Sequence, residues 1–193
     1  IEYTSSCITT SGKKEFLYGR FEVRAKIPVS GGAWPAIWTL GSGMEWPSCG
    51  EIDIMEYYRI KGEPHILANA AWGTDRQWSA KWKSKAIPFT HFTDKDPQWA
   101  DKFHVWRMDW DEKYICIYLD DVLLNKTDLS TTNNKGDHGA GDGGNINPFS
   151  NNIEGFGQLM MLNLAIGGNN GRPIEATFPL EYRVDYVRVY QKQ

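Results

Sequence analysis

Apolar and polar positions alternate along most of this 193-residue chain. In the run FEVRAKI, residues 21–27, every second residue is apolar and the residues between them are charged. A period of two is typical of a β-strand with one buried face. Similar runs occupy residues 33–40, 66–72, 103–110, 114–121, 157–168 and 184–191. Because the chain offers no capped amphipathic helix of three turns, the pattern predicts an all-β protein, a sandwich of antiparallel sheets.

Two long polar stretches interrupt the predicted strands. Residues 73–102 carry Trp78, Trp82 and Trp99 between charged residues, and residues 130–152 are rich in Asn, Gly and Asp. Loops of this length in a compact domain are usually functional. Neither an internal repeat nor a linker divides the chain, so we expect it to form a single domain.

The composition excludes several classes of partner and cofactor. With 21 basic and 24 acidic residues and a net charge of -3, the chain has no basic footprint for nucleic acid. No apolar run approaches the roughly 20 residues of a membrane-spanning helix. Cys7, Cys49 and Cys116 lack the spacing of a disulfide framework or a zinc site, and we predict that they are buried free thiols.

The stretch CGEIDIMEYY places three carboxylates, Glu51, Asp53 and Glu56, on an apolar strand. Along a regular strand Glu51 and Asp53 would share one face, while Glu56 would point to the other. A β-bulge near Ile54 and Met55 would put two residues into one pleat and bring Glu56 round to its partners. The sequence therefore predicts a row of three acids.

A row of acids on one strand face has a specific chemical use. Like charges repel, and the usual escape is that one acid keeps its proton at neutral pH. Hydrolysis of a glycosidic bond needs this arrangement, one carboxylate as nucleophile and one carboxylic acid as proton donor. The outer Cα atoms would lie about 13 Å apart by strand rise, and inclined Glu side chains can close this to the roughly 5 to 5.5 Å of a retaining pair. Asp53 is placed to hold Glu51 by a hydrogen bond.

Two other interpretations of the acidic row are a solvated strand face and a metal site. The stretch contains no His, and hard cations prefer loop oxygens to strand side chains. Nearby Trp34, Trp46 and Trp72 argue against a solvated face, since flat rings suit the apolar faces of sugars. Asn163 is an amide on an otherwise apolar strand face, where it either satisfies a neighbouring backbone group or holds a sugar hydroxyl.

The motif GEIDIMEYY resembles the signature of glycoside hydrolase family 16, in the form carried by laminarinases and related endo-β-glucanases. Lichenases of this family have a motif one residue shorter, so Met55 places the chain on the laminarinase side, which agarases share. Flanking pieces agree in order, at residues 18–28, 34–41, 46–57, 103–110, 146–149, 162–168 and 184–191.

The resemblance implies a concanavalin-like β-jelly-roll sandwich of two curved antiparallel sheets, with a concave cleft for a polysaccharide. It implies a single catalytic domain over residues 1–193, with Glu51 as nucleophile, Glu56 as general acid/base and Asp53 assisting. The implied substrate is β-1,3-glucan, with mixed-linkage β-1,3-1,4-glucan as a second candidate. An agarase- or porphyranase-type galactan hydrolase and a non-catalytic lectin-like module stay open as alternatives.

Three further expectations follow from the resemblance. Relatives carry N-terminal strands that have no counterpart here, which predicts a longer native chain or a partner fragment of the same protein. The chemistry requires no cofactor, but a calcium ion often binds the convex side of such sandwiches, which makes Asp185 a candidate ligand. Because large polysaccharides stay outside cells, we expect a secreted, cell-surface or periplasmic protein.

Overall fold

The computed structural model describes residues 2–135, 145–150 and 157–192. Its strands are β1 (Cys7–Thr9), β2 (Gly19–Lys26), β3 (Ala33–Gly41), β4 (Glu51–Ile60), β5 (Glu63–Gly73), β6 (Ala80–Pro88), β7 (His104–Trp110), β8 (Tyr114–Leu119), β9 (Val122–Asp128), β10 (Gln158–Ile166) and β11 (Arg183–Tyr190). The described helical segments are one α-helical turn, α1 (Thr90–Thr93), and the 3-10 turns Trp99–Asp101, Leu129–Thr131, Gly168–Asn170 and Glu175–Thr177. The predicted all-β class is confirmed. Among the described residues, no helix has the length and apolarity needed to cross a bilayer.

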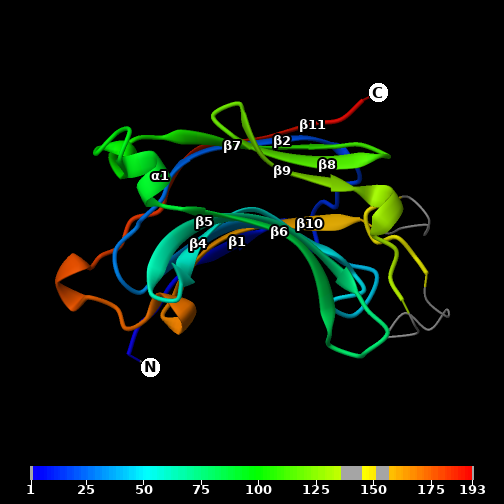
Figure 1. Ribbon diagram of the computed structural model, residues 1–193, viewed down its shortest axis with the longest axis horizontal. Helices are drawn as coiled ribbons and strands as arrows, with labels where there is room; N and C mark the ends of the chain where they lie inside the picture. The colour runs from blue at the N-terminus through cyan, green and yellow to red at the C-terminus, as the bar shows by residue number, and fades with distance from the viewer. Residues whose placement is uncertain (1, 136–144, 151–156, 193) are drawn as a thin grey trace.

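The strands form two antiparallel sheets that pack face to face. The six-stranded sheet has the order β1-β10-β3-β4-β5-β6, and the five-stranded sheet has the order β11-β2-β7-β8-β9. Figure 1 shows the six-stranded sheet as an arch whose outer face is concave and whose inner face covers the other sheet. The predicted sandwich of curved antiparallel sheets is therefore confirmed.

The alternation seen in the sequence produces the core between the sheets. On β2, Phe21, Val23 and Ala25 are fully buried, while the charged residues between them are partly exposed. The facing strand β4 contributes Ile52, and the same cluster includes large rings such as Trp106. Apolar burial of this kind provides most of the stability of a sandwich.

The stretch 73–102 is not the loop that its polarity suggested. It contains the edge strand β6, the turn α1 and a 3-10 turn that carries the buried Trp99. The sequence AKWKSKAIP of β6 does alternate. Neither face of the strand is strongly apolar, however, because both faces of this edge strand are exposed. The thiol prediction was also wrong in part, since Cys49 is buried but Cys7 is exposed on the edge strand β1.

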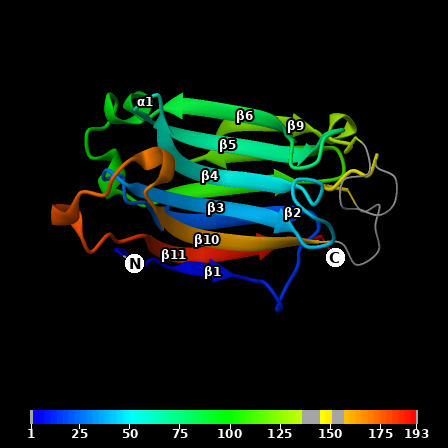
Figure 2. The ribbon, with the colours of Figure 1, turned by 90° about the horizontal axis from the view of Figure 1, so that it is seen from below.

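The two sides of the sandwich differ in how their edges are protected. Figure 2 shows β6 and β9 on one side and β1 and β11 on the other. On the first side, the amide of Asn125 in β9 donates to the backbone oxygens of Ala68 (2.9 Å) and Lys83 (3.0 Å), which joins the two sheets. On the second side, Ile8 is 68% exposed and Val187 is 44% exposed.

The two hydrogen bonds of Asn125 form a bridge between the sheets, and its removal should cause a measurable loss of stability. Asn125→Ala removes both donated hydrogen bonds of a side chain that is 6% exposed. We expect the free energy of unfolding, measured with urea, to fall by about 1–3 kcal/mol. The matched control is Val122→Thr on the same strand, where the side chain is 66% exposed and the expected change is within about 0.5 kcal/mol. Equal stability of the two variants would show that the bridge contributes nothing.

Candidate active site

A β-bulge in β4 assembles the three acids on the concave face. The ladder between β4 and β5 shifts register between Asp53 and Glu56, and the ladder between β3 and β4 passes over Ile54. Ile54 and Met55 are both fully buried, so both occupy the core side of one pleat. Glu56 consequently returns to the face that carries Glu51 and Asp53. The bulge predicted from the sequence is confirmed at the predicted residues.

Gly50 sets the start of this strand. Its φ of +77° lies in the left-handed region, which favours glycine. A Cβ atom here would lie 2.8 Å from the Phe149 ring and 2.8 Å from Pro148. The segment 146–149 thus packs directly against the backbone that leads into Glu51, because no side chain intervenes.

Indole groups hold the two outer acids. Trp46 donates its Nε1–H to Oε2 of Glu51 at 2.7 Å, and Trp34 donates its Nε1–H to Oε1 of Glu56 at 3.2 Å. Asp53 lies between them and shares a hydrogen bond with Glu51. Neutral donors therefore orient both outer carboxyl groups without placing a positive charge beside them.

Burial raises the pKa of all three acids. The effect is largest for Asp53, which is 2% exposed, and the charges of Glu56 and Glu51 raise the pKa of Asp53 further. Burial also raises the pKa of Glu51, but hydrogen bonds from Trp46 and Asp53 oppose this increase. The Asp53–Glu51 hydrogen bond lowers the pKa of Glu51 and raises that of Asp53. This hydrogen bond therefore favours the proton on Asp53 and the negative charge on Glu51.

Two main causes raise the pKa of Glu56. Burial is the larger, and the charge of Glu51 adds to it, while the hydrogen bond from Trp34 works in the opposite direction. A carboxyl group that keeps its proton beside an anionic neighbour is suited to act as a general acid.

Asn69 on β5 is a site residue that the sequence analysis missed. Its Nδ2 group donates to Oδ2 of Asp53 at 3.0 Å and to Oε2 of Glu56 at 3.2 Å. The side chain is 2% exposed, and its Oδ1 atom has no hydrogen-bond partner. The sequence offers one signal for Asn69, a lone amide within the apolar run ILANAAW. Asn163 has the same feature in its own apolar run.

The structure brings Asn163 to the concave face, beside the acids. The register places Asn163 opposite Ala36, which in turn lies opposite Glu56. Its Oδ1 atom accepts a hydrogen bond from Nε1 of Trp38 at 2.7 Å. The amide oxygen is thus satisfied by a neighbouring side chain, and a role of Asn163 in holding a sugar hydroxyl stays a prediction.

Trp72 lies apart from the other predicted aromatic residues. It alternates with Ala71, which pairs with Glu51, so Trp72 points to the opposite face of β5. Its side chain is 3% exposed and belongs to the core cluster. Trp34 and Trp46 line the acid face, but this placement argues against contact between Trp72 and a substrate there.

Asp185 lies on β11 of the other sheet, at a register irregularity between Val184 and Tyr186. Its carboxylate forms an ion pair with Nη1 of Arg24 at 2.6 Å. Within residues 2–135, 145–150 and 157–192, no group of three His, Cys, Asp or Glu side chains could hold a metal ion. The carboxylate of Asp185 is thus paired with a guanidinium, and calcium binding stays a prediction.

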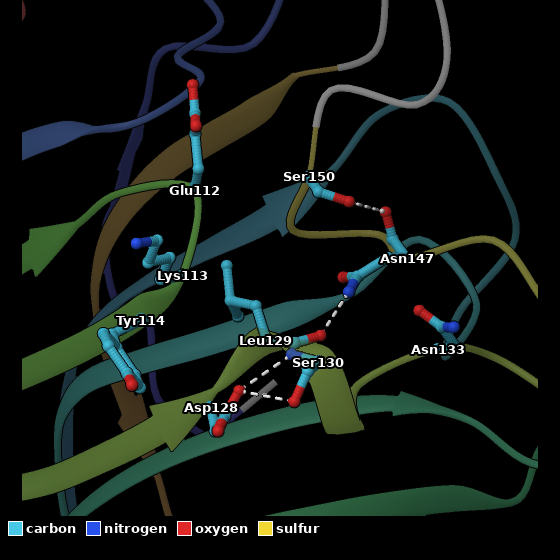
Figure 3. Close-up of a pocket in the computed structure, with 9 residues that line it drawn as sticks. All are labelled: Glu112, Lys113, Tyr114, Asp128, Leu129, Ser130, Asn133, Asn147 and Ser150. Carbon is cyan, nitrogen blue, oxygen red and sulfur yellow. Dashed lines mark hydrogen bonds between the residues drawn. The ribbon is translucent and has the colours of Figure 1, made fainter.

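A separate cavity of about 430 Å³ lies next to the turn at Leu129. Figure 3 shows its lining residues bonded to one another: Asn147 Nδ2 donates to the Leu129 oxygen at 2.5 Å, and Ser130 Oγ donates to Asp128 at 2.7 Å. None of the three acids lines this cavity. Its polar groups support the turn, so the open concave face is the better candidate for chemistry.

Comparison with known proteins identifies the family of the chain. The family model described as "Glycosyl hydrolases family 16" matches residues 1–140. A beta-1,3-glucan-binding protein from Penaeus monodon is 36% identical, and the match covers 87% of this chain and 48% of that protein. A beta-glucanase from Rhodothermus marinus is also 36% identical, with 98% and 63% covered. The chain therefore spans about half to two thirds of the length of these curated relatives.

A solved structure extends the comparison to three dimensions. The laminarinase catalytic domain from Thermotoga maritima superposes with a TM-score of 0.69 at 30% identity. The match covers 97% of this chain and 69% of that chain.

The raised pKa of Asp53 predicts a pH-dependent gain in stability for Asp53→Asn. Above the ordinary value of 3.8 the unfolded chain has lost this proton, whereas the folded protein keeps it until the raised pKa is reached. Wild-type stability therefore falls as the pH rises through this window. The asparagine does not titrate, so its advantage in the free energy of unfolding should grow as the pH rises above 3.8.

Urea unfolding at a series of pH values measures this difference. Asp75→Asn, in the turn between β5 and β6 where the side chain is exposed, controls for the loss of one negative charge. An advantage for Asp53→Asn that is constant across the series would contradict the assignment of the proton to Asp53.

Proposed function

Because the chain belongs to glycosyl hydrolase family 16, we propose that it is an endo-acting, retaining hydrolase of β-1,3-glucan. Mixed-linkage β-1,3-1,4-glucan is the second candidate substrate. The observation that carries this proposal is the row of Glu51, Asp53 and Glu56 on the concave face, built by the bulge at Ile54 and Met55. The names of the Rhodothermus and Thermotoga relatives, a beta-glucanase and a laminarinase, support the substrate class.

The proposed first step forms a glycosyl-enzyme. An oxygen of Glu51 attacks the anomeric carbon while the bond from that carbon to the leaving glycosidic oxygen breaks. Glu56 gives its proton to the leaving oxygen, so the departing sugar chain ends in a hydroxyl group. The proton on Asp53 and the indole of Trp46 keep Glu51 oriented and ionised before the attack.

The second step restores both groups. The charge of Glu51 disappears in the ester, which removes one of the two main causes that raise the pKa of Glu56. Glu56 then takes a proton from a water molecule whose oxygen attacks the anomeric carbon, and the bond to Glu51 breaks. Two inversions at one carbon leave the product with the β configuration of the substrate.

A sugar-binding module without catalysis is the main rival, and the printed name of the Penaeus relative describes binding. A binding protein gains nothing from three buried acids whose pKa values are all raised, since holding them together costs stability. The alternative of a galactan hydrolase would suit a site with basic groups. Among the described residues, the recorded donors to the acids are neutral indole and amide groups, and no ion pair reaches them.

The partner and location belong to the same proposal. The strand edges of β1 and β11 lie on one side of the sandwich with exposed apolar residues, including Ile8 and Val187. Such edges pair readily with a further strand. We therefore propose that an additional segment of the same protein, or a separate fragment of it, pairs with this side. Because large polysaccharides stay outside cells, we propose that the enzyme is secreted, on the cell surface or in the periplasm.

The substrate class is tested by incubating the protein with laminarin, mixed-linkage β-glucan and agarose in parallel. We expect new reducing ends from laminarin and, by proton NMR, the β-anomer as the first product. Cleavage of agarose alone would move the chain to the galactan hydrolases. If none of the three is cleaved but laminarin is bound, the binding-module alternative is correct.

The roles of the two outer acids are separated by a substrate whose leaving group needs no proton. Glu51→Gln and Glu56→Gln should each reduce the cleavage of laminarin at least 10³-fold, an order-of-magnitude expectation for the loss of a nucleophile or a general acid. On an aryl β-glycoside with an acidic phenol as leaving group, Glu56→Gln should still form the glycosyl-enzyme, whereas Glu51→Gln should not. Near-normal cleavage of laminarin by Glu56→Gln would exclude it as the general acid.

A further inference from the structure

The edge strand β6 presents an aromatic residue to the same face as the acids. Trp82 pairs with Ala71, and Ala71 pairs with Glu51, so the three side chains lie on one face in one row across the sheet. With neighbouring strands about 4.7–4.9 Å apart, the backbone of Trp82 lies about 10 Å from that of Glu51. The Trp82 side chain is 44% exposed. It is therefore not a core residue.

The opposite face of β6 has a different character. Lys81, Lys83 and Lys85 alternate with Trp82 and point away from the acids. Charged residues on an edge strand prevent pairing with another sheet, which explains the lysines. This protection does not account for an exposed indole on the other face.

A second exposed indole lies in the adjoining turn. Trp78 is 56% exposed and has a φ of +61°, a backbone region that bulky residues rarely adopt. The turn is closed by hydrogen bonds from the Thr74 amide (3.2 Å) and hydroxyl (2.9 Å) to the Ser79 oxygen. Figure 1 shows this hairpin, between β5 and β6, curving away from the five-stranded sheet, on the concave side. Strained residues of this kind concentrate at ligand-binding sites.

We propose that Trp82, supported by Trp78, forms a sugar-binding platform at the β6 end of the concave face. The ligand is a pyranose unit of the same glucan chain, remote from the bond that is cleaved, whose apolar C–H face stacks on the indole ring. This inference rests on the proposed function for the identity of the sugar. Its position rests on the cross-strand row that connects Trp82 to Glu51.

A remote platform has a defined kinetic consequence. Only a substrate long enough to reach β6 gains binding energy there, and a contact remote from the reacting bond stabilises the bound substrate and the transition state equally. A large aromatic anchor at an interface typically contributes 1 kcal/mol or more, which corresponds to about fivefold or more in affinity. The platform should therefore determine the preference for chain length and leave the chemical step unchanged.

The experiment compares Trp82→Ala and Trp78→Ala with Lys83→Ala, a control on the same strand whose side chain points to the other face. We expect Trp82→Ala to lower kcat/KM on laminarin about tenfold through KM. On the shortest laminari-oligosaccharide that the wild type cleaves, the change should stay within about twofold. Trp78→Ala should act in the same direction but more weakly, and Lys83→Ala should match the wild type on both substrates.

Two kinetic results would overturn the platform. Equal losses on long and short substrates would mean that Trp82 only supports the fold, and no loss on laminarin would mean that the chain does not reach β6. Affinity electrophoresis in laminarin gels separates this inference from the proposed function. If the wild type cleaves nothing but binds laminarin, and Trp82→Ala loses that binding, the platform stands without catalysis. Unchanged retardation, or no retardation of the wild type, would overturn the platform.

Discussion

The bulge in β4 is the constraint on which the rest of the site depends. Ile54 and Met55 are both buried in the core, so burial of two apolar side chains fixes the direction in which Glu56 points. A regular strand would turn Glu56 towards the other sheet, where an acid would lie uncompensated in the hydrophobic core. The energy that holds the acids in a row therefore comes from packing on the opposite side of the sheet.

The row of three acids lowers the stability of the fold locally. Hydrogen bonds from the surrounding residues reduce this loss without removing it. Burial and mutual repulsion raise the pKa values of the acids. Trp34, Trp46 and Asn69 supply directed hydrogen bonds, but no positive charge that would pull the proton away. A cation at this position would lower the pKa of Glu56 and weaken its use as an acid. Neutral donors orient the carboxyl groups without adding the attraction of a full positive charge, so the pKa of Glu56 stays raised despite these hydrogen bonds.

The two sides of the sandwich have different tasks. The β6 side carries lysines along its edge and the Asn125 bridge between the sheets, so it is protected against further pairing. The β1 and β11 side exposes apolar residues along unpaired edges, which suits the addition of a strand. The same asymmetry leaves one face of β6 free to present Trp82 beside the row of acids.

Local rules in the sequence were sufficient for the fold class, for the three acids and for the bulge. Strand alternation has a period of two, and the spacing of Glu51, Asp53 and Glu56 breaks that period by one residue. The partners of the acids depended on cross-strand register, which no single segment contains. Asn69 reaches two acids because β5 pairs with β4, Trp72 turns into the core by the same register, and Trp82 reaches the acid face through β6. The sequence by itself thus determined that three acids share one strand face, and the tertiary structure decided which neighbours orient them, because strand pairing joins residues that are distant in the chain.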